Sequence, residues 1–167
     1  IVSTGCITTA AYPTSPPDDV AYVLGHAEAS MVFVENAAQL DKVLEKLDEL
    51  PEIKLIVVFD PEDAAGHDIV CTYEEFLAEG ERAGDEIERE RVGRLDAVTP
   101  DSILTYIYTS GTTGPPKGAM LTHGNAIYIA ETANSLGVVD TRDSSLSFLP
   151  LAHALERMVF YMSVLSG

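Results

Sequence analysis

The chain has 167 residues, of which 46% are hydrophobic, and its formal net charge is −17. This composition supports one folded domain with a core and argues against disorder. The negative charge argues against nucleic acid and anionic membrane surfaces as partners, because both are bound through clusters of Lys and Arg.

Strand and helix patterns alternate in the first 60 residues. Short apolar segments at 5–11, 31–34 and 53–59 predict strands, and the last of them is rich in β-branched residues. Two helices are predicted between these strands, the first capped by Ser15 and the second opened by Asn36. This order predicts an α/β fold with a mostly parallel sheet and helices packed on both of its faces.

The segment 61–98 is markedly acidic, with 12 Asp and Glu among the 36 residues from 61 to 96. We expect a charged surface connection here, and the alternative is an interaction tail. Within it, Thr72 and Glu75 match a capping box that would start a short helix. Alternating charges at 86–94 predict a further turn or two of solvated helix.

Regular structure is expected again from residue 99 onward. Strands are predicted at 102–109, 118–121 and 145–149, and helices at 123–136 and 154–165. Thr122 is the expected cap of the first of these helices, and Gly137 is its expected C-terminal stop. The whole chain is therefore predicted to be one partial α/β domain, divided into 1–60, 61–98 and 99–167.

A loop rich in Gly, Ser and Thr follows the apolar strand directly, at 109–118 (TSGTTGPPKG). Glycines let backbone N–H groups approach phosphate oxygens, and hydroxyls add donors or metal ligands. Lys117 is the only Lys or Arg from 95 to 141, so its charge is well placed for a polyphosphate. The Walker pattern is excluded, because Pro116 and Gly118 stand where GxxxxGK[ST] needs Gly and then Ser or Thr.

Three segments resemble the adenylate-forming superfamily, which includes acyl-CoA synthetases, luciferases and the adenylation domains of peptide synthetases. Residues 108–118 (YTSGTTGPPKG) are similar to its phosphate-binding loop. Residues 148–158 (FLPLAHALERM) and 12–35 are similar to the form found in long-chain fatty acyl-CoA synthetases. The resemblance implies an internal fragment of the large N-terminal domain of a long-chain fatty acid–CoA ligase.

The resemblance also implies roles for individual residues. The ATP phosphates would be bound by Thr109, Ser110, Gly111, Thr112, Thr113, Gly114 and Lys117. Thr112 is the hydroxyl implied to lie near Mg²⁺, and Lys117 and His153 are the implied catalytic residues. His153 would line the acyl-adenylate site, while Glu156 and Arg157 would hold the local helix. The residues alone leave two other readings of His153 open, a metal ligand with Glu156 or a histidine bonded at the start of a helix.

By the same resemblance, the full-length enzyme activates a fatty acid as acyl-AMP with release of pyrophosphate, and then forms the CoA thioester. ATP, Mg²⁺ and CoA are the expected cofactors and co-substrates. The family's remaining catalytic groups lie downstream of this segment, so the fragment alone is expected to be inactive. The alternatives are a ligase for an aryl or amino acid, a phosphotransferase, and a non-catalytic nucleotide-binding module.

The start of the chain and its cysteines bear on its location. It begins at Ile1 without a methionine or a basic-then-apolar leader, and no apolar run reaches the roughly 18 residues of a membrane span. We therefore expect an excised piece of a cytoplasmic protein, with peripheral membrane contact open only to regions outside this chain. Cys6 and Cys71 are expected to be free thiols.

Overall fold

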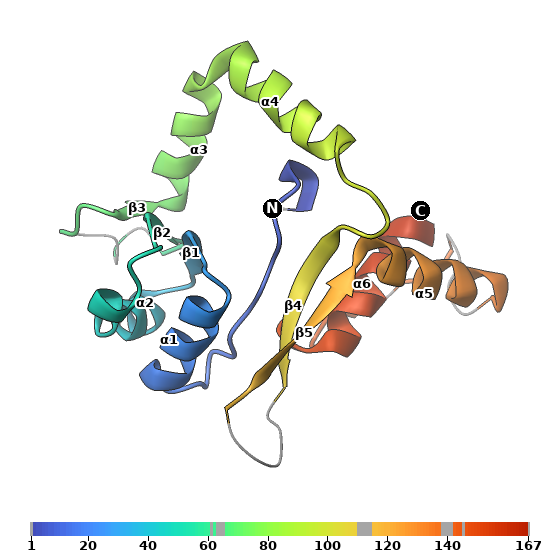
Figure 1. Ribbon diagram of the computed structural model, residues 1–167, viewed down its shortest axis with the longest axis horizontal. Coiled ribbons are helices and arrows are strands. Elements are labelled where there is room, and N and C mark those ends of the chain that lie inside the picture. Colours follow the sequence, from blue (N-terminus) through green and yellow to red (C-terminus); the bar gives the residue numbers. More distant parts are fainter. Residues whose placement is uncertain are drawn as a thin grey trace. The chain divides into compact units, whose positions relative to one another are not determined.

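The computed structural model describes residues 2–60, 62, 66–109, 115–137, 142–144 and 146–166 (Figure 1). They divide into two compact units, unit 1 formed by Ile1–Ala10 with Arg91–Gly167, and unit 2 formed by Ala11–Glu90. The elements in chain order are η1 (Val2–Thr4), α1 (Pro17–His26), β1 (Met31–Val34), α2 (Ala37–Leu44), η2 (Leu47–Glu49), β2 (Leu55–Val58), β3 (Val70–Thr72), α3 (Tyr73–Arg82), α4 (Gly84–Asp96), β4 (Ile103–Thr109), β5 (Lys117–Thr122), α5 (His123–Ser135) and α6 (Ala154–Ser166).

Unit 2 is built on a three-stranded parallel sheet in the order β1-β2-β3. Its central strand β2 is fully buried at Ile56, Val57 and Val58, as expected for a parallel strand with a continuous apolar sequence. Buried side chains of α1 and α2 join this strand in one hydrophobic core. The parallel sheet and its helices confirm the predicted α/β class.

The starts of α1 and α2 differ from each other. Asn36 caps α2 as predicted, since its Oδ1 accepts a hydrogen bond of 3.3 Å from the Gln39 N–H. The predicted Ser15 cap is wrong, because the residue at the cap of α1 is Pro16. A proline has no side-chain acceptor, and its fixed φ instead leads directly into a helix whose first residue is Pro17.

Two predicted strands are not formed. The segment 5–11 makes only an isolated parallel bridge that pairs Thr8 with Thr105, and no strand runs through the described residues 146–149. A strand needs a partner along several residues, and local apolar character does not supply one. The third strand of the parallel sheet is β3, which comes from the acidic segment that we expected to be a connection.

The acidic segment is more helical than predicted. The Thr72–Glu75 capping box at the start of α3 is confirmed, with both reciprocal hydrogen bonds present. The alternating charges belong to α4, a helix of 13 residues and not of one or two turns. Neither α3 nor α4 has a buried residue, so both expose their charged side chains.

Unit 1 contains the antiparallel hairpin β4–β5, which lies beside α5 and α6 (Figure 1). The predicted strands at 102–109 and 118–121 correspond to β4 and β5, and the two predicted helices correspond to α5 and α6. Thr122 caps α5 through a second capping box with Asn125, and Gly137 follows the helix at φ +67°. These predictions are therefore confirmed.

Candidate functional site

The glycine-rich loop is the connection of the β4–β5 hairpin. The register places Thr109, the last residue of β4, directly opposite Lys117, the first residue of β5. Opposite residues of an antiparallel pair project from the same face, with Cβ atoms about 4.5–5.5 Å apart. Both residues are exposed, so the side chains of a threonine and a lysine leave the hairpin on the same face, next to the loop.

The other predicted phosphate contacts cannot be placed in the same way. Ser110, Gly111, Thr112, Thr113 and Gly114 lie outside the described residues. Their roles, including that of Thr112 near Mg²⁺, stay predictions.

The element behind the loop is β5, the strand predicted at 118–121. In a Walker loop the phosphates sit at the N-terminus of a helix that follows directly. Here β5 begins at Lys117, and α5 begins only six residues later at His123. The loop therefore offers backbone and side-chain donors from a hairpin, and no helix dipole follows it directly.

Gly118 adjoins Lys117 and has a packing reason to be glycine. A Cβ added there would lie 3.2 Å from Cζ of Tyr108 and 3.4 Å from its Oη. The register pairs these two residues across the hairpin, so the tyrosine ring occupies the space that a side chain would need. The sequence indicated only that Gly118 breaks the Walker pattern.

His153 lies in the turn that precedes α6 and is exposed. Its backbone N–H donates to the Pro150 carbonyl at 2.8 Å, and its Nδ1 accepts from the Leu155 N–H at 3.2 Å. An Nδ1 that accepts is unprotonated, so the neutral ring carries its proton on Nε2. The structure thus shows the helix-start role of His153, while its contact with an acyl-adenylate stays a prediction.

Glu156 and Arg157 follow in the first turns of α6, and both are buried, with 4% and 7% of their surface exposed. The Ser147 hydroxyl donates a short hydrogen bond to Oε1 of Glu156. Burial lowers the pKa of Arg157, an effect that the nearby Tyr161 partly opposes. Burial also raises the pKa of the Tyr161 hydroxyl.

The guanidinium of Arg157 reaches oxygens from three different segments. Its Nε donates to the Leu151 carbonyl at 3.1 Å, and its Nη1 donates to Thr8 Oγ1 at 3.1 Å. The same Nη1 donates a short hydrogen bond to Oγ1 of Thr105. The two threonines were missed by sequence reasoning, and the only available signal was a hydroxyl at position 105 inside an otherwise apolar strand.

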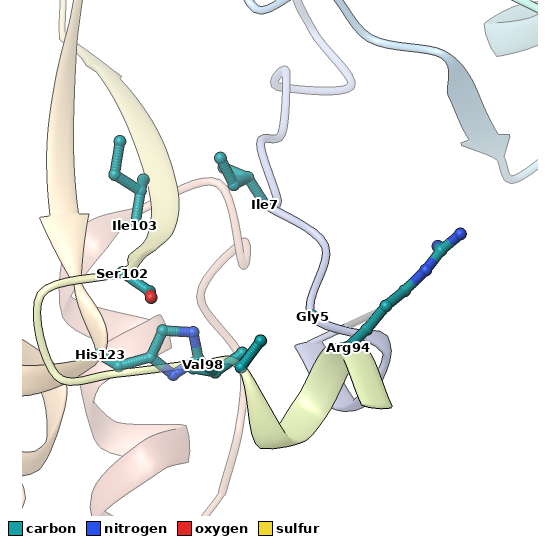
Figure 2. A pocket seen from close by; sticks show the side chains of 8 residues that line it. Gly5, Ile7, Arg94, Val98, Ser102, Ile103 and His123 are labelled. Atoms are coloured by element: carbon teal, nitrogen blue, oxygen red, sulfur yellow. The ribbon is translucent and has the colours of Figure 1, made fainter. Parts of the chain in front are cut away.

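A pocket of about 430 Å³ lies at the other end of β4 and does not belong to the loop. It is lined mainly by small and apolar residues, with Ser102, His123 and Arg94 as polar members. Figure 2 shows the Arg94 side chain pointing away from the other labelled side chains. Ile103 in this pocket and Thr109 at the loop are six positions apart along β4, a distance of about 20 Å.

The described residues bear on the remaining alternatives in three ways. They contain no group of three or more His, Cys, Asp or Glu side chains that could hold a metal ion, so no ligand set forms around His153 and Glu156. None of the helices in the described ranges is both long and apolar enough to cross a membrane. The two cysteines are free thiols, Cys6 exposed and Cys71 partly exposed, as predicted.

Comparison with known proteins identifies the family. Residues 1–167 match the family described as AMP-binding enzyme, so the chain belongs to that family. It is 33% identical over 153 residues to the long-chain-fatty-acid–CoA ligase ACSBG2 of Xenopus laevis, covering 89% of this chain and 20% of that protein. It is 35% identical over 156 residues to fatty acyl-CoA synthetase B of Dictyostelium discoideum, covering 89% and 22%. The chain thus spans about a fifth of the length of these relatives.

Solved structures share the fold. The luciferase-like enzyme of the mealworm Zophobas morio aligns with a TM-score of 0.75 at 22% identity, covering 99% of this chain and 35% of that one. A long-chain-fatty-acid–CoA ligase from Archaeoglobus fulgidus aligns with a TM-score of 0.67 at 22% identity, covering 94% and 28%. The chain therefore has the fold of part of the N-terminal domain of adenylate-forming enzymes.

Proposed function

We propose that the full-length protein containing this chain is an ATP-dependent long-chain fatty acid–CoA ligase. It would activate a fatty acid as acyl-AMP with release of pyrophosphate, and then pass the acyl group to the thiol of CoA. The observation that carries this proposal is the pairing of Thr109 with Lys117 at the mouth of the loop, in a chain that lies entirely within the AMP-binding enzyme family. The names of the relatives support fatty acids as the carboxylate substrate.

Lys117 would act on the phosphates of ATP. A carboxylate oxygen of the acid attacks the α-phosphorus, the bond to the oxygen that bridges the α- and β-phosphorus breaks, and pyrophosphate leaves with the electron pair. The leaving group gains negative charge in this step, and a fixed ammonium beside it lowers the barrier. Thr109 would add a hydroxyl donor on the same face of the hairpin.

The loop residues 110–114 complete this phosphate site in the proposal. Thr112 would be the hydroxyl nearest Mg²⁺, an ion that neutralises phosphate charge when it is bound. Hydroxyls and phosphate oxygens are ligands that Mg²⁺ prefers, so the donor set of this loop suits the ion.

His153 would contact the acyl-adenylate through the ring nitrogen that faces away from the helix. Because Nδ1 is engaged by the Leu155 N–H, Nε2 is left to donate a hydrogen bond to a neutral or anionic oxygen. In this assignment His153 would serve the acyl-adenylate as a hydrogen-bond donor. CoA would be bound by regions outside this chain.

Product analysis of the full-length protein tests the proposal. The protein is incubated with ATP, Mg²⁺, CoA and a panel of long-chain, aryl and amino acids. AMP, pyrophosphate and a long-chain acyl-CoA are the expected products. ADP would indicate a phosphotransferase, an aryl or amino acyl product would indicate another ligase, and no nucleotide turnover with any acid would indicate a binding module.

The 167-residue chain alone is proposed to be inactive, because it covers about a fifth of the relatives' length. The measurement is acid-dependent exchange of labelled pyrophosphate into ATP by the isolated chain. Exchange above the rate without acid would contradict this part of the proposal.

A further inference from the structure

Arg157 holds a position that a stability argument does not explain. Its guanidinium is buried and bonded to two hydroxyls and a carbonyl. Transfer of a charge out of water is costly, and apolar residues of similar volume are often at least as stable at buried charged sites. Thr105, its partner on β4, is completely buried as well. Stability alone therefore gives little reason for an arginine at this position.

The hydrogen bonds of the guanidinium connect the two halves of the candidate site. Thr105 lies on β4, the strand that leads into the phosphate loop, and Leu151 lies in the turn that carries His153. The N-terminal segment around Thr8 is bonded to the same part of β4. The Thr8 carbonyl accepts from the Tyr106 N–H at 2.9 Å and from Thr105 Oγ1 at 2.8 Å.

Because Thr105 is held by these hydrogen bonds, the part of β4 that leads to the loop is restrained as well. Residues 105, 107 and 109 alternate along β4 and so share one face. The register of the hairpin is irregular between Ile103 and Thr105, and such bulges let a strand change direction. The hydrogen bonds to Thr105 fix β4 just past that irregularity, four residues before Thr109.

We propose that Arg157 is a positioning residue that sets Thr109 and Lys117, the residues at the two ends of the phosphate loop, in place relative to His153. The inference rests on the proposed function for its catalytic consequence. Arg157 touches no substrate: it acts through Thr105 on one side and through the Leu151 carbonyl on the other. A loop displaced by about 1 Å can lower the rate of a positioned reaction by up to roughly 100-fold.

Kinetics of the full-length protein test the catalytic consequence. In Arg157→Met, kcat/KM for ATP in pyrophosphate exchange, per folded molecule, is expected to fall roughly 10- to 100-fold. Arg157→Lys keeps the charge without the planar fork and is expected to fall less. The matched control is Arg82→Met, which removes an exposed arginine paired with Glu79 at 3.1 Å in the other unit. A value for Arg157→Met equal to that of the control, even with a lower melting temperature, would overturn the proposal.

A double-mutant cycle tests the route through Thr105. Thr105→Val removes the hydroxyl, leaves the shape of the strand nearly unchanged, and remains informative if Arg157→Met fails to fold. Thr105→Val alone is expected to lower kcat/KM, and in the Arg157→Lys background it is expected to add less than it does alone, since coupled residues are not additive. Fully additive effects would overturn the route through this hydroxyl.

Amide hydrogen exchange separates this inference from the proposed function. In protein without substrates, Arg157→Lys and Thr105→Val are expected to speed exchange at 104–109, and Arg157→Lys also at 150–155, relative to Arg82→Met. Unchanged exchange at both segments would overturn the inference. Absence of AMP formation by the wild-type protein with every acid would instead refute the proposed function, and the exchange result would still decide the anchoring.

Discussion

The capping box at the start of α5 provides a sharp test of local stability next to the candidate site. Thr122 ends β5 and caps α5, so it joins the strand behind the phosphate loop to its helix. Its Oγ1 accepts from the Asn125 N–H at 3.2 Å, and its own N–H donates to Asn125 Oδ1 at 3.0 Å. Thr122→Ala removes the first bond and keeps the second.

The expected cost follows from that single lost acceptor. A helix cap changed from Thr to Ala destabilises by about 1 kcal/mol, within a range of roughly 0.5–2 kcal/mol. The same substitution at Thr132, later in α5, provides the control. Thr132 Oγ1 donates to the Tyr128 carbonyl at 2.7 Å, a local bond that does not stabilise helices. Since Ala has the higher helix propensity, Thr132→Ala is expected to gain roughly 0.5 kcal/mol.

The assay is urea unfolding followed by far-UV circular dichroism, because the chain has no Trp. The two variants are expected to differ by about 1.5 kcal/mol in the free energy of unfolding, with equal urea dependence. If both variants unfold at the same urea concentration, the capping hydrogen bond does not contribute as argued.

Three further predictions concern charge, packing and pH. Lys117→Gln in the full-length protein is expected to lower kcat/KM for ATP by about tenfold or more. The control Lys54→Gln, at an exposed lysine in the other unit, should leave kcat/KM unchanged. If the two variants have the same kcat/KM, Lys117 does not belong to the phosphate site. Gly118→Ala is expected to lower the free energy of unfolding by about 1 kcal/mol, because the added Cβ would contact the Tyr108 ring. A second change, Tyr108→Leu, should restore the lost stability. If the double variant is no more stable than Gly118→Ala, the contact is refuted. Hydrogen bonds from the Thr72 N–H and hydroxyl hold the pKa of Glu75 below its usual range. The carboxylate therefore stabilises the folded form above the unfolded-state pKa, and this contribution is lost as pH falls through the folded-state pKa. As pH falls from the unfolded-state pKa through the folded-state pKa of Glu75, the wild-type protein should therefore lose more stability than Glu75→Gln. If the urea midpoints of the two proteins fall equally from neutral to acidic pH, the prediction is contradicted.

Local signals in the sequence predicted most of the elements near the site. The apolar run into 109, the Thr122 cap and Gly137 each depend on residues within a few positions, so they are visible without tertiary structure. Strand pairing is different, because it depends on which distant segment supplies hydrogen bonds. The segment 5–11 looked like a strand but found a partner only at Thr8.

The role of Arg157 could not be predicted from local pattern. It is separated by 149 residues from Thr8 and by 52 from Thr105, and the resemblance implied only that Glu156 and Arg157 hold the local helix. Among the described residues, its hydrogen bonds show which segments converge at the base of the candidate site, and the motif alone did not contain that information.

In the proposed function, the hairpin makes Lys117 important, because no helix follows the loop directly. A Walker loop places phosphate at the positive end of a helix dipole, and its lysine adds to that field. In this chain β5 follows the loop directly, and successive strand dipoles largely cancel. The positive field at the loop must then come from Lys117, from backbone N–H groups and from any bound cation. Lys117 is the first residue of a paired strand and lies opposite Thr109, so its backbone is fixed while its side chain is exposed. The same reasoning makes the anchor on β4 important, because a hairpin that is not held at its base would carry its only cation out of position.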